Sequence, residues 1–203
     1  MPCGALLTTP CCDAITGTRD LQKLSKQAIF SLHRSDFQKA ATQLAQVVAK
    51  SREIFDGYIK DEPALRQGSY ANAMEEFAEA VLFKVWLEDK VICAADGPAL
   101  EGLIDSSEYI GGLADFTGEV GRVAVAAASR RDDVAVRECL AADLSVQDAL
   151  MKLGLPGKLG KKESMLKTNV KKLEHVLYEL SLIKASGRKV SAATTQEASA
   201  DGE

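Results

Sequence analysis

The stretch "EYIGGLADFTGEVGR", from Glu108 to Arg122, places Asp115 and Glu119 four residues apart in a run of small and apolar residues. In an α-helix, residues at this spacing lie on one face. Two like charges there destabilise an exposed helix by roughly 0.2–0.5 kcal/mol, and a buried one by more. Each glycine in a helix costs about 1 kcal/mol relative to alanine, and this run contains Gly111, Gly112, Gly118 and Gly121. We therefore expect a helix whose glycines allow close packing and whose acids need a compensating partner.

A second acid pair lies in the segment "MEEFAEA", residues 74–80, where Glu76 and Glu79 are three residues apart. If the two helices face each other, four carboxylates meet, and such a cluster is stable only when protons or cations neutralise it. Mg²⁺ is the hard cation that prefers oxygen ligands of this kind. Acid pairs at these spacings are also common on solvated helix faces, and Arg122 could pair with Glu119. The spacing alone leaves both interpretations open.

Other metal sites and redox chemistry have little support in the sequence. A di-iron helical bundle uses a Glu-x-x-His motif on each of two helices, and neither His33 nor His175 follows a glutamate by three residues. The five cysteines form an odd set, and adjacent Cys11 and Cys12 suit neither a disulfide framework nor a zinc motif. We interpret the cysteines as reduced thiols and both histidines as structural, so any metal must be held by oxygen.

The composition predicts an all-α protein that folds as one domain, a bundle of about seven helices. Helix-forming residues are plentiful, prolines number only 5, and 46% of the residues are hydrophobic. Hydrophobic periodicity and capping residues predict helices over residues 18–34, 37–60, 69–92, 96–104, 105–130, 133–152 and 161–185. We expect the helical domain to cover residues 18–186, after a flexible N-terminal segment, 1–17, and before a disordered tail, 187–203.

The net charge of −4 hides a basic block near the C-terminus. Residues 151–190 contain ten lysines and arginines against three acids, which gives a local charge of +7 and leaves −11 elsewhere. Such a block is either a solvated helix face or a surface that binds nucleic-acid phosphates. The candidate phosphate-binding residues are Arg34, Lys158, Lys161, Lys162, Lys167 and Lys171.

The sequence has no run of about 18 apolar residues, which a membrane span requires. Its N-terminus, "MPCGALLTTPCCDA", lacks the basic start and the long apolar region of a secretory signal. We expect a protein of the cytoplasm or the nucleus that does not enter a membrane.

Four segments together resemble the translin superfamily, and the resemblance covers about residues 19–185. They are "LSKQAIFSLHR" (24–34), "EEFAEAVLF" (75–83), "EYIGGLADFTGEVGR" (108–122) and "VKKLEHVLYELSL" (170–182). The resemblance implies a helical bundle that assembles into a hollow octamer, either from this chain alone or as a hetero-oligomer with translin. It also implies binding of single-stranded RNA, or of single-stranded DNA.

The acid motifs are most similar to those of the translin-associated factor X branch, which read Glu-(Tyr/Phe)-x-Glu-Ala and Ala-Asp-(aromatic or Leu)-Thr-Gly-Glu. By that resemblance Glu76, Glu79, Asp115 and Glu119 match the catalytic acids of an endoribonuclease that requires Mg²⁺ and cleaves single-stranded RNA. The four acids are therefore both the predicted catalytic residues and the predicted metal ligands. The alternative is a non-catalytic scaffold of the same superfamily that binds single-stranded DNA or RNA.

Overall fold

The computed structural model describes the backbone of residues 9–100, 102–154 and 157–197, and their side chains except those of residues 9–15, 158 and 187–197. In these residues the chain forms six α-helices, two short helical turns and no β-strand. The elements, in chain order, are α1 (Thr9–His33), α2 (Phe37–Ile54), the π-helical turn η1 (Phe55–Ile59), the 3₁₀ turn η2 (Pro63–Arg66), α3 (Ser69–Asp89), α4 (Ser106–Ser129), α5 (Asp133–Leu153) and α6 (Gly157–Glu197). The predicted all-α class is confirmed.

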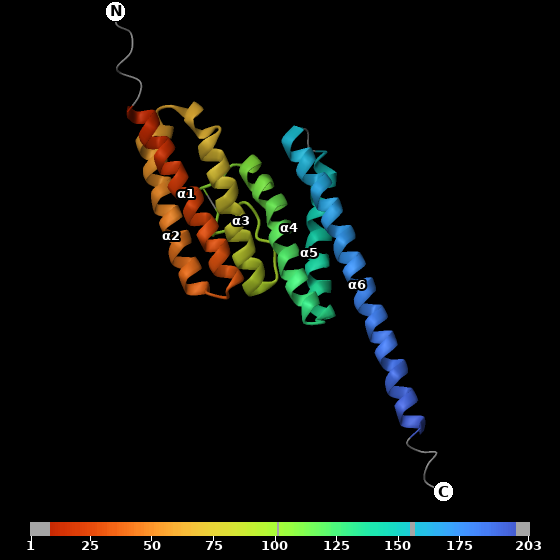
Figure 1. Ribbon diagram of the computed structural model, residues 1–203. Coiled ribbons are helices and arrows are strands. Elements are labelled where there is room, and N and C mark those ends of the chain that lie inside the picture. Colours follow the sequence, from red (N-terminus) through yellow and green to blue (C-terminus); the bar gives the residue numbers. More distant parts are fainter. Residues whose placement is uncertain (1–8, 101, 155–156, 198–203) are drawn as a thin grey trace, which may run out of the picture.

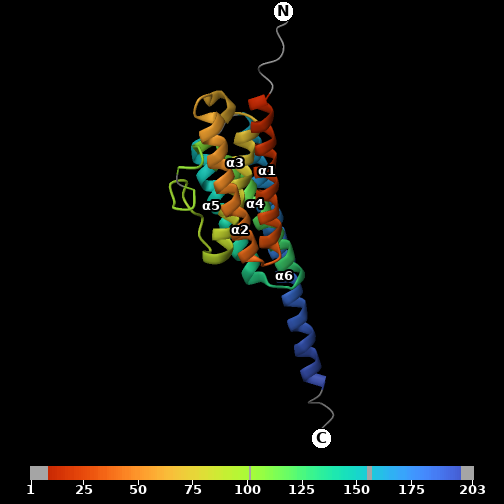
Figure 2. The same ribbon diagram turned by 90° about the vertical axis from the view of Figure 1, so that its left-hand side faces the viewer.

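The helices form a bundle in which chain neighbours pack side by side. Figure 1 shows the order α1/α2, α3, α4, α5/α6 across the molecule, and α6 runs on beyond the other helices. In the view turned by 90°, α1 and α6 lie toward one side of the bundle, and α3 and α4 lie in its middle (Figure 2). The core between the helices contains the fully buried rings of Phe77, Phe83 and Phe116. As a result, α3 and α4 each present one face toward the space between α1 and α6.

The predicted short helix over residues 96–104 is wrong, and the described residues between α3 and α4 form turns instead. Gly102 has a φ of 71°, which is outside the helical region. Leu100 is fully buried, and its side chain packs this segment against the core. The hydroxyl of Tyr109 donates a hydrogen bond of 2.8 Å to the carbonyl oxygen of Cys93. This correction reduces the expected seven helices to six α-helices among the described residues.

Two helices extend further than their predicted ends. Helix α1 begins at Thr9 rather than near Thr18, because Pro10 is compatible with the first turn of a helix, where no hydrogen-bonded N–H is needed. Helix α6 continues to Glu197 rather than ending near Ala185, and this extension contains no proline. The rest of the predicted flexible ends, residues 1–8 and 198–203, lies outside the described residues.

Two of the four glycines in α4 bring this helix against α3. A Cβ atom at Gly112 would lie 2.7 Å from the Cβ of Ala78 and 2.7 Å from the backbone oxygen of Glu75. A Cβ atom at Gly111 would lie 2.6 Å from the side chain of Glu75. The predicted packing role holds for these two, whereas Gly118 and Gly121 have no such neighbour within 4 Å. The contact between α3 and α4 therefore depends most on Gly112, whose neighbours include backbone atoms that cannot turn aside.

We predict that Gly112→Ala destabilises the protein by about 1–3 kcal/mol, because the added methyl group forces α4 away from the backbone of α3. The matched control is Gly121→Ala in the same helix, where the methyl group meets open space. The control should be neutral or up to about 1 kcal/mol more stable, since alanine is the better helix former. Urea denaturation measures both. Equal stability of Gly112→Ala and the parent would show that the two helices are free to separate without loss.

Candidate functional site

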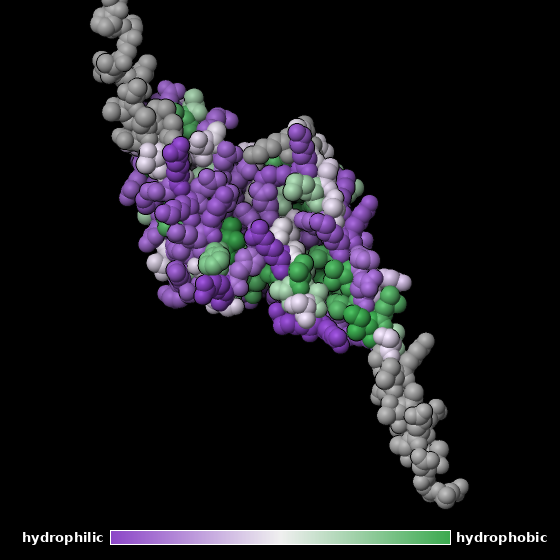
Figure 3. Space-filling model, viewed as in Figure 1, coloured by the Kyte–Doolittle hydropathy of each residue, from purple (hydrophilic) through white to green (hydrophobic). Residues whose placement is uncertain are grey.

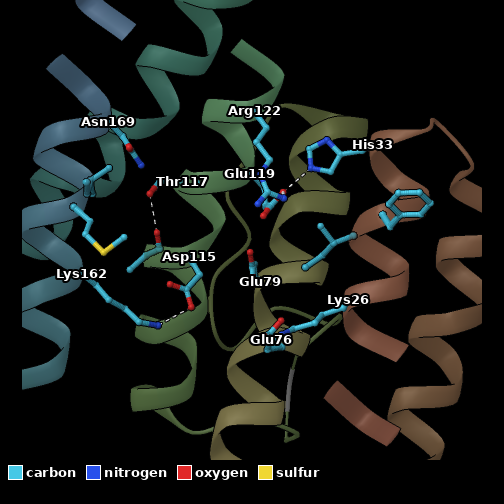
Figure 4. A pocket seen from close by; sticks show the side chains of 16 residues that line it. Lys26, His33, Glu76, Glu79, Asp115, Thr117, Glu119, Arg122, Lys162 and Asn169 are labelled. Atoms are coloured by element: carbon cyan, nitrogen blue, oxygen red, sulfur yellow. Dashed lines mark hydrogen bonds and ion pairs between the residues drawn. The ribbon is translucent and has the colours of Figure 1, made fainter. Parts of the chain in front are cut away.

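A pocket of about 580 Å³ lies between α1 and α6, and residues of α3 and α4 line it from the side of the core. It contains all four acids that the sequence singles out: Glu76 and Glu79 come from α3, and Asp115 and Glu119 come from α4. Figure 4 shows these acids pointing into the space between Lys162 on one side and Lys26 and His33 on the other. The fold thus brings two pairs of carboxylates, 36 residues or more apart in the chain, into one site.

Glu79 is the most buried of the four acids, with 7% of its surface exposed. Burial first, and then the nearby charges of Asp115, Glu76 and Glu119, together raise the pKa of Glu79 to about 8. Among the described residues, no side chain forms a hydrogen bond or ion pair with Glu79. A carboxyl group in this setting carries a proton at neutral pH unless a cation replaces the proton.

The other three acids each have a cationic partner. Glu76 lies 3.1 Å from the ammonium group of Lys26 on α1. Glu119 accepts a hydrogen bond of 3.1 Å from Arg122, as the sequence allowed, and its carboxylate lies 2.5 Å from the Nε2 atom of His33. These contacts join α1 to α3 and α4 through charged groups at the rim of the pocket.

Asp115 pairs with Lys162, which also ties α6 to the two central helices. The ammonium group of Lys162 donates hydrogen bonds of 2.7 Å to Asp115, 2.9 Å to Glu75 and 3.1 Å to the carbonyl oxygen of Gly111. Burial lowers the pKa of Lys162, but the hydrogen bonds and charges of Asp115 and Glu75 outweigh this effect and raise it. Lys162 is therefore a stable cation inside the pocket, and removal of its charge would leave two acids uncompensated.

The predicted phosphate-binding residues fall in different places. Lys162 lies inside the pocket, while Arg34 follows the end of α1, with its guanidinium 5.6 Å from the centre of the Phe30 ring. Lys167 pairs with Glu163 at 2.6 Å on α6. Lys161 and Lys171 are exposed on α6, and the side chain of Lys158 lies outside the described residues. Of this set, the structure brings Lys162 to the acids, and the described lysines of the rest of the set line no part of the pocket.

The pocket also contains polar residues that sequence reasoning did not single out. His33, which we interpreted as structural, contacts Glu119 and packs against the ring of Phe83 at 4.8 Å. Thr117, Lys26 and Asn169 line the same pocket, together with Arg122, which the sequence had offered as a partner of Glu119. Lys26, Phe30 and His33 are spaced by four and three residues, which is a helical stripe, but the sequence alone could not show that this stripe faces the acids. His175 is exposed on α6, 3.8 Å from Glu179.

The donor chemistry of the pocket suits Mg²⁺, since its four acids offer oxygen ligands and Glu79 lacks a cationic partner. In the described part of the chain, however, no three acidic, histidine or cysteine side chains are placed to hold one metal ion. Lys26, Arg122 and Lys162 instead supply the positive charge that pairs with Glu76, Glu119 and Asp115 respectively. The residues fit the ion in type, while in this structure three of the four acids are paired with cationic side chains.

The structure is a helical bundle with four carboxylates in one pocket, and its sequence matches a known family. The model of the Translin family matches residues 14–184. The chain therefore belongs to the translin family. No curated protein matches this sequence. Among the described residues, no helix combines the length and apolar character that a bilayer span requires.

Solved structures support the fold. The crystal structure of apo-NeC3PO has a TM-score of 0.76 and 17% identity, over 87% of this chain and 100% of that chain. The crystal structure of AfC3PO has a TM-score of 0.76 and 17% identity, over 86% and 91% of the two chains. The AfC3PO complex with duplex RNA has a TM-score of 0.74 and 16% identity, over 88% and 93%. At this identity the likeness shows the helical fold.

We predict that the free energy of unfolding falls as the pH rises from about 4.5 to about 8, because native Glu79 keeps a proton that the unfolded chain has released. Glu79→Gln removes this contribution. The variant should be more stable than the parent by roughly 1–3 kcal/mol near the upper end of this range and equal to it near the lower end.

Urea denaturation in metal-free buffer over this pH range measures the difference. Asp143, whose burial raises its pKa to about 7, adds a slope of the same sign to parent and variant alike. The control Glu88→Gln removes an exposed acid from the same helix, and its stability should follow the parent at every pH. A Glu79→Gln variant that keeps the parent's full pH dependence would contradict the assignment.

Proposed function

We propose that this chain is a Mg²⁺-dependent endoribonuclease subunit of the translin-associated factor X type, which binds and cleaves single-stranded RNA in the cytoplasm or nucleus. The observation that carries the proposal is the convergence of Glu76, Glu79, Asp115 and Glu119 in one pocket of a translin-family fold. A purely structural protein has no need to place Glu79 beside three other acids at the edge of the core. The AfC3PO structure with duplex RNA supports a nucleic-acid ligand for this family.

In this proposal Glu79, Asp115 and Glu119 would hold the ion, and Glu76 would orient the attacking water or accept its proton. Glu76 suits this role because its side chain is 21% exposed, whereas its helix neighbour Glu79 is buried. Bound Mg²⁺ would neutralise charge on the scissile phosphate and lower the pKa of a coordinated water. Lys162 and Arg122 would exchange their carboxylate partners for phosphate oxygens at the wall of the pocket.

A second candidate function is a non-catalytic scaffold for single-stranded RNA or DNA. It is favoured by the ion pairs that hold Glu76, Asp115 and Glu119 and by the absence, among the described residues, of three acids placed around one point. In this case the acids and their cationic partners serve as ion pairs that hold α1, α3, α4 and α6 together. The two functions differ in whether Mg²⁺ displaces Lys26 and Lys162 from their carboxylate partners.

We predict that Asp115→Asn and Glu119→Gln each reduce Mg²⁺-dependent cleavage of a labelled single-stranded RNA by roughly 10²-fold or more, with RNA binding unchanged or slightly stronger. Both changes keep the shape of the side chain and remove one negative charge. Glu88→Gln, which alters an acid outside the pocket, should cleave at the parent rate. Cleavage is assayed with the chain alone and with added translin, in Mg²⁺ and in EDTA.

Thermal melts with and without Mg²⁺ separate the two functions. Mg²⁺ should raise the melting temperature of the parent and of Glu88→Gln, and much less that of Asp115→Asn, because ligand binding stabilises the folded state. A Glu119→Gln variant that cleaves at the parent rate would refute the catalytic assignment. RNA binding by the parent without any cleavage in Mg²⁺, alone or with translin, would establish the scaffold instead.

We also propose that the chain assembles into a translin-type oligomer, either a homo-oligomer or a hetero-oligomer with translin, with the octamer as the expected form. On α6 the exposed side chains of Tyr178, Leu182 and Ile183 are 57%, 46% and 43% accessible. Figure 3 shows hydrophobic side chains gathered over this part of α6, beyond the largely hydrophilic surface over α1. Such a contiguous apolar surface is typical of a protein interface.

We predict that Leu182→Glu with Ile183→Glu dissociates the assembly into smaller species, because the new charges would be buried without partners. Leu144→Glu on α5, at an apolar side chain of similar exposure (42%), is the matched control and should assemble normally. Light scattering measures the mass of each. A parent chain that is a stable monomer at micromolar concentration, with or without translin, would contradict the proposed assembly.

A further inference from the structure

The exposed face of α1 carries a stripe of four cationic side chains and one aromatic ring. The residues are Arg19, Lys23, Lys26, Phe30 and Arg34, which we call the α1 stripe. The four residues on α1 are spaced by four, three and four residues, which places them in one row about 16 Å long, and Arg34 follows just beyond the end of the helix. All five are exposed. The stripe has the length and the charge to contact several successive phosphates of one strand.

The stripe is free of compensating acids over most of its length. Asp20 is the one acid of α1 within residues 16–33, and it is held by Lys50 of α2 at 2.9 Å. Lys26 pairs with Glu76, but among the described side chains no acid forms an ion pair with Arg19, Lys23 or Arg34. A solvated helix face of a protein with net charge −4 would more often interleave acids with these cations.

A second hollow lies along the stripe next to the acid pocket. This hollow, of about 420 Å³, is lined by Arg19, Gln22, Lys23, Lys26, Gln27 and Phe30. Lys26 and Phe30 also line the acid pocket. The two hollows therefore share these two residues, which stand where the stripe borders the acid pocket.

Phe30 is the most unusual residue of the stripe because 63% of this large apolar side chain is exposed. The guanidinium of Arg34 lies 5.6 Å from its ring centre. Proteins that bind single strands combine a basic row with aromatic rings on which unpaired bases stack. A paired base in a duplex is not available for such stacking, so an exposed ring beside a basic row favours a single strand.

We propose that the α1 stripe is the track along which single-stranded RNA enters the acid pocket, with Phe30 as the stacking platform for the base at its entrance. Phosphates contact Arg19, Lys23 and Arg34 outside the pocket. At the entrance a phosphate competes with Glu76 for Lys26, so that RNA binding releases the carboxylate of Glu76 into the pocket. The inference rests on the proposed function for its ligand class, but binding along α1 requires neither Mg²⁺ nor cleavage.

Fluorescence anisotropy in EDTA tests the track without any contribution from catalysis. The probes are a labelled oligouridine and a labelled RNA duplex of the same length. Arg19→Glu with Lys23→Glu should weaken oligouridine binding at least tenfold and reduce the slope of log K against log salt by about 1.4, since two phosphate contacts are lost. The matched control, Lys39→Glu with Arg52→Glu, places the same charge changes on exposed residues of α2 and should bind much more tightly than the α1 variant.

Phe30→Ala should weaken binding of oligouridine by roughly 5- to 150-fold and leave binding of the duplex unchanged. Phe55→Ala, at another partly exposed phenylalanine (39%), should bind both probes like the parent. Circular dichroism checks that each variant is folded. Photo-crosslinking of 5-iodouridine RNA to the parent protein provides a measurement that needs no variant, and the crosslink should map to Phe30.

Three results would overturn the track. The first is an α1 double variant that binds oligouridine no more weakly than the α2 control, and the second is a Phe30→Ala variant whose affinity for oligouridine is within twofold of the parent's. The third is loss of binding in Lys161→Glu with Lys171→Glu while the α1 double variant binds normally. Failure of the proposed function is distinct from these. A parent that binds oligouridine along α1 but cleaves it in Mg²⁺ neither alone nor with added translin supports the track and refutes the nuclease.

Discussion

The close approach of α4 to α3 at Gly112 is the contact on which the acid pocket depends. With no Cβ atom at this position, the backbones come close enough that a methyl group would lie 2.7 Å from both Ala78 and the oxygen of Glu75. One turn beyond Gly112, α4 presents Asp115 toward the face of α3 that carries Glu79. A wider separation of the helices would let water between the acids, and their mutual repulsion and the raised pKa of Glu79 would diminish.

Three of the four acids in the pocket are paired with cations and the fourth is not. Lys26, Lys162 and Arg122 compensate three of the acids from three different helices, while the buried Glu79 has no such partner among the described residues. The same ion pairs hold α1 and α6 over the central helices. Any ligand that draws these cations away therefore changes both the charge of the pocket and the contacts that close it.

The two outer helices have different surfaces. The described part of α1 presents cationic side chains and the exposed ring of Phe30 beside the pocket, whereas the C-terminal half of α6 presents apolar side chains such as Leu182. A basic row with an aromatic ring suits a nucleic acid, and an apolar helix face suits a protein partner. The two proposed contacts, with RNA and with a second subunit, thus involve different outer helices of the bundle.

The sequence by itself determined the all-α class, most helix boundaries and the pairing of acids on two helices, because helical periodicity and capping are local properties of the chain. It also showed that Glu119 and Arg122 could pair. The turn segment around Gly102 and the roles of Lys162, Lys26 and His33 were decided by the tertiary structure. Spacing along one helix shows which residues share a face, but only packing shows what that face meets. Lys162 reaches Asp115 across 47 residues of sequence because α6 folds back over α4, and no local pattern encodes that contact.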